Sequence, residues 1–470
     1  MIVAKSYSGK RVAVMGLARS GQSAVAALKA GGADVIAWDD NGSKCKETEP
    51  LGACITDLKE EDFTKIDALV LSPGIPHSYP KPHEVVEQAK KANTPVIGDI
   101  EIFATNYVKP RIIGITGTNG KSTTTSLIGH ILKCAQIPHE VGGNIGRPAL
   151  SFENDTNIIY QVLELSSYQL ELAPSLSCEI GVILNISPDH LDRHGDMRGY
   201  IKAKSKIIEG LTNNGTAVIG IDDPDSRYIG EGLRQNNCKN LSIQYVSGNH
   251  LPKNGVGIVD GCVMSYVNAE ESIIVDLNGN KTLPGTHNQQ NAAAATSVAL
   301  TIGISPEIIK AAILTFSGLP HRQELIGSYK NLTFVNDSKA TNADATARAL
   351  SCYKSIYWIA GGRAKQGGIE SLGKYFPNIK HAFLFGECAK EFALTLEGKV
   401  GYTICDTIHD IFDIILSDLY IAGKQYGVVL LSPAAASFDQ FSSYEVRGNI
   451  FRSLVNDKII GNSKLKRNLP

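Results

Sequence analysis

The stretch RIIGITGTNGKST, residues 111–123, decides the fold of this chain. A β-branched run leads into a glycine-rich turn and then into a helix that we expect to begin near Lys121. Such a turn directs backbone N–H groups and a helix N-terminus at a phosphate, and Gly117 and Gly120 let the backbone approach closely. The motif predicts a nucleoside triphosphate site in which Lys121 binds the β and γ phosphates and the Ser122 hydroxyl binds Mg²⁺.

The match to the general phosphate-loop pattern has one exception, because Ile115 stands where that pattern begins with glycine. A chance Gly-Lys-Ser turn after a strand is therefore the alternative reading. We expect ATP rather than GTP, since no N-K-x-D element that would read guanine follows. The predicted ATP contacts in the loop are Gly117, Thr118, Asn119, Gly120, Lys121, Ser122 and Thr123.

Length and composition limit the class of protein. A chain of 470 residues exceeds what one core usually organises, and 43% hydrophobic with 20% charged residues is typical of a globular protein. Lys plus Arg (46) nearly balances Asp plus Glu (47), so no global field attracts nucleic acid or a membrane. Nine cysteines without a C-x-x-C pair predict neither a disulfide framework nor a zinc site. No signal-peptide core opens the chain, so a cytoplasmic protein is expected.

The first part of the chain reads as a β-turn-α unit of Rossmann type. The run RVAVMGL is followed by the turn GLARSG, residues 16–21, which has only two of the three fingerprint glycines. A dehydrogenase site or a purely structural turn are alternatives, but with a phosphate-loop domain following we expect a diphosphate-bearing substrate here. Its predicted contacts at the strand ends are Ser20, Asp39, Asp40, Ser72, Pro73 and Gly74.

Alternating strands and helices predict an α/β protein of three domains. A Rossmann-like domain is expected over residues 1–97, a central phosphate-loop domain over 98–318 and a C-terminal Rossmann-like domain over 319–470. Short β-type runs between residues 241 and 278 predict a small antiparallel excursion on the central domain. The segment SGLPHR, residues 317–322, is expected to be a linker around which the third domain closes.

Several blocks, in this order, resemble the Mur ligase family: TGTNGKST (116–123), GGNIG (142–146), LELSSYQLE (163–171) and DHLDRH (189–194). Later blocks are similar to those of the members that add D-glutamate, namely LPGTHNQQN (283–291), NDSKATN (336–342), GGRAKQGG (361–368) and SPAAASFDQF (432–441). The resemblance implies an ATP-dependent ligase of peptidoglycan synthesis, and we expect the protein to be a monomer. Its substrates would be UDP-N-acetylmuramoyl-L-alanine and D-glutamate, and an acyl phosphate would be the intermediate.

The resemblance also implies the catalytic residues. Lys121, Glu164, His190 and Lys204 would be catalytic, with two Mg²⁺ ions held by Ser122, Glu164, His190 and Lys204. Lys204 would carry a carbamate formed with carbon dioxide, which turns a cation into an oxygen ligand. Lys202 and Lys206 are rivals for that role, and a solvated lysine face is the alternative. Asp189 would support the loop that carries His190.

The remaining expected contacts also follow from the resemblance. Asn144 and Ser166, with Ser167, would contact the muramoyl-alanine part of the substrate. Asn288, Asn291 and His287 would contact ATP, together with Arg322 and Asp337, although Arg322 could instead form a hinge ion pair. D-glutamate has two carboxylates, which cations and hydroxyls can bind. Its expected pocket consists of Lys339, Thr341, Lys365, Ser437, Phe438 and Tyr444.

Two other functions remain open from the sequence. Another Mur-type or folylpolyglutamate-type ligase would share the ATP site but take a different amine. A nonenzymatic phosphate-loop protein would bind nucleotide without turnover. Phosphate release with different amines distinguishes all three functions.

Overall fold

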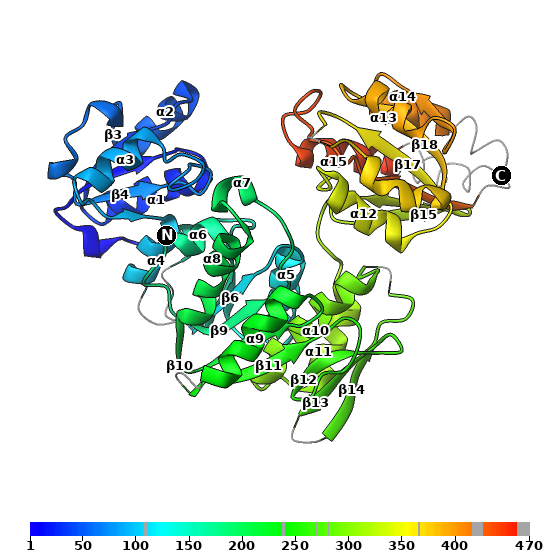
Figure 1. The fold of residues 1–470 in the computed structure, drawn as a ribbon, viewed down its shortest axis with the longest axis horizontal. Coiled ribbons are helices and arrows are strands. Elements are labelled where there is room, and N and C mark those ends of the chain that lie inside the picture. The colour runs from blue at the N-terminus through cyan, green and yellow to red at the C-terminus, as the bar shows by residue number, and fades with distance from the viewer. Residues whose placement is uncertain are drawn as a thin grey trace, which may run out of the picture. The chain divides into compact units, whose positions relative to one another are not determined.

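The computed structural model describes residues 1–107, 111–153, 155, 157–236, 240–267, 270–280, 282–364, 367–415 and 426–457. It is an α/β protein with three β-sheets, as predicted (Figure 1). The chain divides into two compact units, which we call unit 1 (Met1–Asn278 with Asn288–Phe316) and unit 2 (Gly279–His287 with Ser317–Pro470). Unit 1 contains a five-stranded and a nine-stranded sheet, and unit 2 contains a six-stranded sheet. The domain boundaries near residues 97 and 318 stay predictions.

The five-stranded sheet has the order β3-β2-β1-β4-β5, and all its pairs are parallel. Alternate residues of β1 face two different cores, because Val12 and Val14 pack with one cluster and Ala13 and Met15 with another. Helices therefore cover both faces, as parallel sheets require. The elements are β1 (Arg11–Met15), α1 (Arg19–Ala30), β2 (Asp34–Trp38), α2 (Gly42–Thr48), β3 (Cys54–Ile55), β4 (Ala68–Leu71), α3 (Glu84–Lys91), β5 (Val96–Ile97) and α4 (Asp99–Asn106).

The nine-stranded sheet has the order β14-β13-β12-β11-β10-β9-β6-β8-β7. The phosphate-loop strand β6 lies in its interior, paired in parallel with β8 and β9. Its first elements are β6 (Arg111–Thr116), α5 (Lys121–Cys134), β7 (His139–Gly143), β8 (Tyr160–Glu164), α6 (Ser167–Glu171) and β9 (Cys178–Ile183). They continue with α7 (Leu191–His194), α8 (Met197–Glu209), β10 (Leu211–Gly220), α9 (Pro224–Asn236), β11 (Ser242–Val246), β12 (Gly255–Val259), β13 (Cys262–Val267), β14 (Glu270–Asp276), α10 (Thr286–Thr301) and α11 (Pro306–Thr315).

The predicted antiparallel excursion exists, but it begins later than expected. β11 pairs in parallel with both β10 and β12, so it continues the main sheet. Only β12, β13 and β14 form an antiparallel run. The sequence analysis missed β12, whose run GVGIV contains two glycines and therefore has low β-propensity.

The sheet of unit 2 has the order β15-β16-β20-β17-β18-β19. β15 pairs antiparallel with β16, and all other pairs are parallel. The sequence analysis missed β15. The elements are β15 (Glu324–Tyr329), β16 (Leu332–Asn336), α12 (Ala343–Cys352), β17 (Ile356–Gly361), β18 (Ile379–Phe385), α13 (Ala389–Leu396), β19 (Tyr402–Ile404), α14 (Ile408–Ile414), β20 (Gly427–Leu431) and α15 (Tyr444–Leu454).

Both faces of this third sheet are also buried. Trp358 of β17 packs in the core cluster that includes residues of α12 and α13, whereas Ile359 packs in the cluster that includes residues of α14 and α15. Within the part of the chain that the structure describes, no helix is both long and apolar enough to cross a membrane.

Candidate functional site

The glycine-rich loop after β6 has the predicted form. Gly120 adopts a left-handed φ of 85° and caps α5, which begins at Lys121. A Cβ at Gly120 would lie 2.1 Å from Asn291 Oδ1, so only glycine fits there. The Lys121 ammonium donates to the carbonyl oxygens of Gly117 and Thr118, each at 2.9 Å. The loop therefore curls around its own lysine.

Side chains from α10 and from the end of β9 fix this loop. Asn185 accepts from the Asn119 N–H at 2.9 Å and donates to Gln290 Oε1 at 3.1 Å. Asn291 donates to Asn288 Oδ1 at 3.1 Å, so both predicted ATP contacts of α10 lie beside the loop. The sequence analysis missed Asn185 and Gln290, although Gln290 stands inside the HNQQN run.

Glu164 ends β8, beside the phosphate-loop strand, as predicted. It is paired with Ile115 of β6 and is 2% exposed. Its Oε1 accepts from Asn144 Nδ2 at 2.8 Å, whereas its buried Oε2 has no hydrogen-bond partner among the described residues. Buried carboxylate oxygens are normally satisfied, so this oxygen is suited to a cation. Ser122, in the first turn of α5, is also buried.

Lys204 lies on α8 and is 1% exposed. Its ammonium donates to Gly117 O at 2.8 Å and lies 4.6 Å from the centre of the Tyr200 ring. Burial lowers the pKa of Lys204 well below its usual value, and the charge of Lys121 lowers it further, against the opposing effects of Asp189 and Glu164. Burial therefore favours the neutral, nucleophilic form of this amine more than it would for an exposed lysine.

His190 occupies the N-cap of α7 with a left-handed φ of 54°. Its Nε2 lies 3.4 Å from Asp189 Oδ2. Burial lowers its pKa, Asp189 raises it, and Lys121 and Lys204 lower it. Lys121, Glu164, Asp189, His190 and Lys204 thus form one group of interacting charges, which we call the lysine–carboxylate cluster.

The number of carboxylate ligands in this cluster fits Mg²⁺. The described residues contain no group of three His, Cys, Asp or Glu side chains arranged around a common metal position. Mg²⁺ is usually bound by only one or two protein carboxylates, with phosphate oxygens and water completing the octahedron. The unsatisfied Oε2 of Glu164, a residue paired with Ile115 of the phosphate-loop strand, meets that demand.

The three loops predicted to hold a diphosphate follow β1, β2 and β4, which are neighbours in the first sheet. Ser72 Oγ donates to Gly16 O at 2.8 Å, and a Cβ at Gly21 would lie 1.8 Å from that same oxygen. Asp39 accepts from the Leu17 N–H at 2.6 Å and from the Asn41 N–H at 2.8 Å. Asp39 therefore orders the loops themselves.

The other predicted residues of this region differ in their surroundings. Ser20 lies in the first turn of α1. The side chain of Asp40 is 62% exposed, and its Oδ2 lies 3.5 Å from His83 Nε2. The carbonyl oxygen of Gly74, which follows Pro73, accepts from Arg193 Nη1 at 2.9 Å. In the nine-stranded sheet region, Ser166 caps α6 in a capping box with Gln169.

In unit 2, the predicted ATP residue Asp337 is buried and directly follows β16. It accepts from Ser432 Oγ at 2.8 Å and from the Gln323 N–H at 3.1 Å. Burial raises its pKa to about 7, against the lowering effects of these bonds and of Arg322 and Arg348. Burial lowers the pKa of His287 to about 4.

The predicted D-glutamate residues lie on loops and a helix start of unit 2. The Lys339 ammonium lies 3.8 Å from the centre of the Tyr444 ring, and the Thr341 N–H donates to Lys339 O at 2.8 Å. Ser437 is buried, whereas the neighbouring Phe438 is 66% exposed. The predicted contact Lys365 lies outside the described residues.

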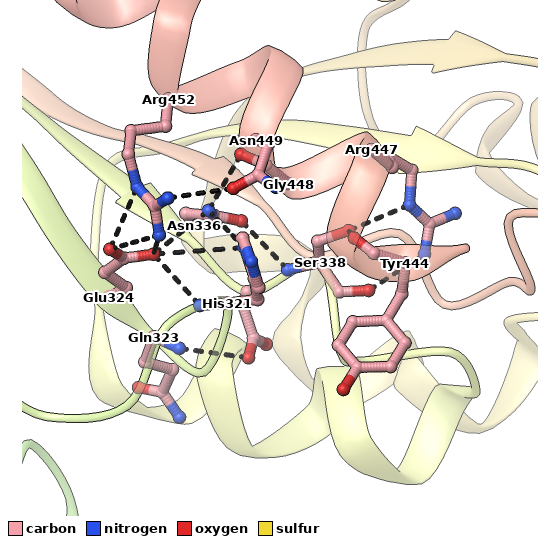
Figure 2. Close-up of polar contacts among 11 residues, drawn as sticks. His321, Gln323, Glu324, Asn336, Ser338, Tyr444, Arg447, Gly448, Asn449 and Arg452 are labelled. Carbon is pink, nitrogen blue, oxygen red and sulfur yellow. Dashed lines mark hydrogen bonds and ion pairs between the residues drawn. The ribbon is translucent and has the colours of Figure 1, made fainter. Parts of the chain in front are cut away.

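Arg447 of α15 ties together the three segments that carry these residues, and the sequence analysis did not identify it. It is 0% exposed. Its guanidinium donates to Ser338 O at 2.9 Å and to Ser338 Oγ at 3.0 Å (Figure 2). It also donates to Ala435 O at 3.1 Å and to Gly361 O at 3.4 Å. Burial lowers its pKa to about 10, so the group stays charged at neutral pH. A lone arginine in a helix gives no sequence signal for such a role.

Together, the fold and the lysine–carboxylate cluster define a phosphate-loop nucleotide-binding α/β protein. Residues 115–299 match the Mur ligase middle domain. The chain is 45% identical to the UDP-N-acetylmuramoylalanine–D-glutamate ligase of Nitrobacter winogradskyi, over 97% of this chain and 98% of that protein. It is 46% identical to the ligase of the same name from Paramagnetospirillum magneticum, again over 97% and 98% of the two chains. The chain therefore belongs to the Mur ligase family.

A solved structure agrees with this at the level of the fold. The UDP-N-acetylmuramate-alanine ligase of Thermotoga maritima matches with a TM-score of 0.58 and 16% identity, over 96% of this chain and 100% of that one.

Proposed function

We propose that this protein joins D-glutamate to UDP-N-acetylmuramoyl-L-alanine at the expense of ATP. The observation that carries the proposal is the identity of about 45% over nearly the whole chain with proteins named for that reaction. The phosphate loop and the lysine–carboxylate cluster supply the groups that such a reaction needs.

The chemistry has two steps. An oxygen of the substrate carboxylate attacks the γ phosphorus of ATP, and ADP leaves. The amine nitrogen of D-glutamate then attacks the acyl carbon, phosphate leaves, and the amine loses a proton. Lys121 would stabilise the charge on the transferring phosphoryl group, and the loop N–H groups at the start of α5 would orient it.

Mg²⁺ is part of this proposal. Ser122, Glu164, His190 and a modified Lys204 would hold two ions, which would neutralise phosphate charge. The support is the unpaired, buried Oε2 of Glu164. Asn144, which donates to the other oxygen of the same carboxylate, would fix its orientation.

Lys204 would react with carbon dioxide to give a carbamate. The neutral amine nitrogen would bond to the carbon and lose one proton, so that a carboxylate-like anion replaces the neutral amine. The support is its almost complete burial beside Gly117, with the pKa of the amine lowered. Labelling with ¹³C-bicarbonate should give one carbamate signal in the NMR spectrum that Lys204→Arg lacks. A signal that persists in Lys204→Arg would exclude this site.

The other contacts are proposed with the same roles as the sequence suggested. Ser20, Asp39, Asp40, Ser72, Pro73, Gly74 and Ser166 would serve the UDP-linked substrate, and Asn288, Asn291, Arg322 and Asp337 would serve ATP. Lys339, Thr341, Lys365, Ser437, Phe438 and Tyr444 would serve D-glutamate.

The reaction is tested by measuring phosphate release from ATP. The purified protein receives UDP-N-acetylmuramoyl-L-alanine and, in turn, D-glutamate, L-alanine, L-lysine or diaminopimelate. We expect turnover with D-glutamate alone. Turnover with another amine would indicate a different ligase, and nucleotide binding without any turnover would indicate a nonenzymatic protein. Lys365→Ala should raise the KM for D-glutamate far more than the KM for ATP, and equal effects would contradict its role.

A further inference from the structure

The short helix α7 contacts both the loop after β4 of the first sheet and helix α6, which follows β8 of the nine-stranded sheet. It begins after His190 of the lysine–carboxylate cluster and ends at His194, with Gly195 as its C-cap. Arg193 Nη1 donates to the carbonyl of Gly74, in the loop that follows β4 of the first sheet. The ring of Tyr79, from the same loop region, lies 3.6 Å from the position a Cβ would take at Gly195. Helix α7 therefore links the predicted diphosphate loop to the lysine–carboxylate cluster.

Arg193 is held from a second side. Its guanidinium carbon lies 4.7 Å from the centre of the Tyr168 ring on α6, and its Nε is buried. Cation–π contacts of this kind favour a fixed guanidinium, which presents several donors in a rigid plane. Tyr168 also stacks on His194, with the ring centres 5.2 Å apart and the planes 11° from parallel. The position of Arg193 is thus set by α6 as well as by α7.

A carboxylate of α6 completes the link. Glu171 Oε2 lies 3.4 Å from His194 Nδ1 of α7 and 3.7 Å from His77 Nε2 of the loop after Gly74. His194 Nε2 lies 2.9 Å from Ser167 Oγ, next to the predicted substrate contact Ser166. The side chain of His194 is 1% exposed. We call Arg193, His194, Glu171 and His77 the α7 clasp.

We infer that the α7 clasp fixes the distance between the predicted diphosphate loop and the lysine–carboxylate cluster, and that Arg193 is its principal positioning residue. This inference rests on the proposed function, because it concerns how the two ends of the UDP-linked substrate are held. Arg193 acts through Gly74 and α7 rather than on the reacting atoms.

The physical basis is the advantage of two linked binding events. When one end of a ligand is bound, the other end is present at a high effective concentration, provided that the two sites stand at the right separation. A clasp that holds the separation reduces the ordering that binding must supply. Without it, each end still binds, but the gain from linking them is smaller.

The experiment compares ligands of different length on the full chain. Calorimetry gives Kd for UDP and for UDP-N-acetylmuramoyl-L-alanine with wild type, Arg193→Met and Arg193→Lys. The control is Arg198→Met, an exposed arginine at the start of α8. Kinetics give kcat and the KM values for the UDP-linked substrate and ATP. Glu171→Gln tests the clasp from its other side.

We expect Arg193→Met to weaken the binding of the full substrate about tenfold, the size of one charge-assisted hydrogen bond, and to change Kd for UDP less than twofold. The KM for the UDP-linked substrate should rise while the KM for ATP stays constant. Arg193→Lys, which keeps the cation near Tyr168, should recover part of the loss, and Arg198→Met should match wild type.

Two results would overturn the inference. If Arg193→Met weakens UDP and the full substrate equally, the arginine acts only within the diphosphate loop. If neither Kd nor the KM for the UDP-linked substrate changes, it holds nothing that matters for binding. A wild-type protein that does not bind the full substrate would instead contradict the proposed function. A variant that fails to fold is recognised by its unfolding curve, and Glu171→Gln then decides between these outcomes.

Discussion

Unit 1 buries Lys204 and unit 2 buries Arg447, and these two long basic side chains have opposite surroundings. The Lys204 amine donates to the carbonyl oxygen of Gly117, and burial lowers its pKa well below the usual range. Arg447 is equally buried but donates to carbonyl oxygens of three segments and keeps a pKa of about 10. Few acceptors leave a group ready to change its chemical state, whereas many acceptors turn it into a fixed support.

The largest effect is expected at Lys204. Lys204→Met should lower kcat by about a hundredfold to a thousandfold, since loss of one group that stabilises transition-state charge has that magnitude. The urea midpoint should stay or rise, because a buried amine that resists protonation disfavours folding below pH 10.5. Turnover assays and urea unfolding on the same samples check both. If Lys204→Met retained a tenth of the activity, Lys204 would not have the catalytic role that distinguishes it from Arg447.

Arg447→Met tests a buried basic group that has several carbonyl acceptors. Removal of the guanidinium leaves the buried carbonyls of Ser338, Ala435 and Gly361 without these donors, so we expect a loss of about 3 kcal/mol in the free energy of unfolding. Urea unfolding provides the measurement. Arg363→Met is the matched control, because Arg363 pairs with Glu387 at the surface, and its midpoint should be close to that of wild type. A stable Arg447→Met would show that the three segments hold together without it.

Asp337 should make the free energy of unfolding of the protein depend on pH. Its folded pKa of about 7 lies above the usual 3.8, so the folded state binds the proton more tightly. This contribution to stability is complete at low pH and is lost as the pH rises toward and through 7. Wild type should lose about 2 kcal/mol relative to Asp337→Asn between pH 5 and pH 7.5. Parallel curves for the two proteins in urea unfolding would show that Asp337 is ionised throughout.

A smaller effect is expected where α15 meets His321. The Asn336 amide lies 3.0 Å from His321 Nδ1, and a Cβ at Gly448 would lie 2.2 Å from that same nitrogen (Figure 2). Gly448→Ala must displace the ring, at a cost of about 1–2 kcal/mol. Gly373→Ala, where an added Cβ meets nothing within 4 Å, is the control. Equal midpoints for the two variants would mean that the ring moves freely.

What the sequence could predict was local in origin. The start of α5 at Lys121 and the position of Glu164 beside the phosphate-loop strand were both correct, since a motif and a strand end determine them. The strands β12 and β15 were missed because glycine interrupts their runs and long-range pairing decides their fate.

The partners of a side chain were harder to predict than its place. Asn185 and Gln290 meet at the phosphate loop from positions 105 residues apart, and nothing in either segment indicates the other. Asp39 was predicted to grip substrate, and its observed bonds go to its own loops. Arg447 acquires its role only when three segments fold around it.

The curled phosphate loop has a kinetic consequence. Because Lys121 already binds two carbonyl oxygens of its own turn, an arriving triphosphate has to exchange those bonds for its own oxygens before it is fully seated. Capture should then occur in two phases, a fast encounter that depends on nucleotide concentration and a slower rearrangement that does not.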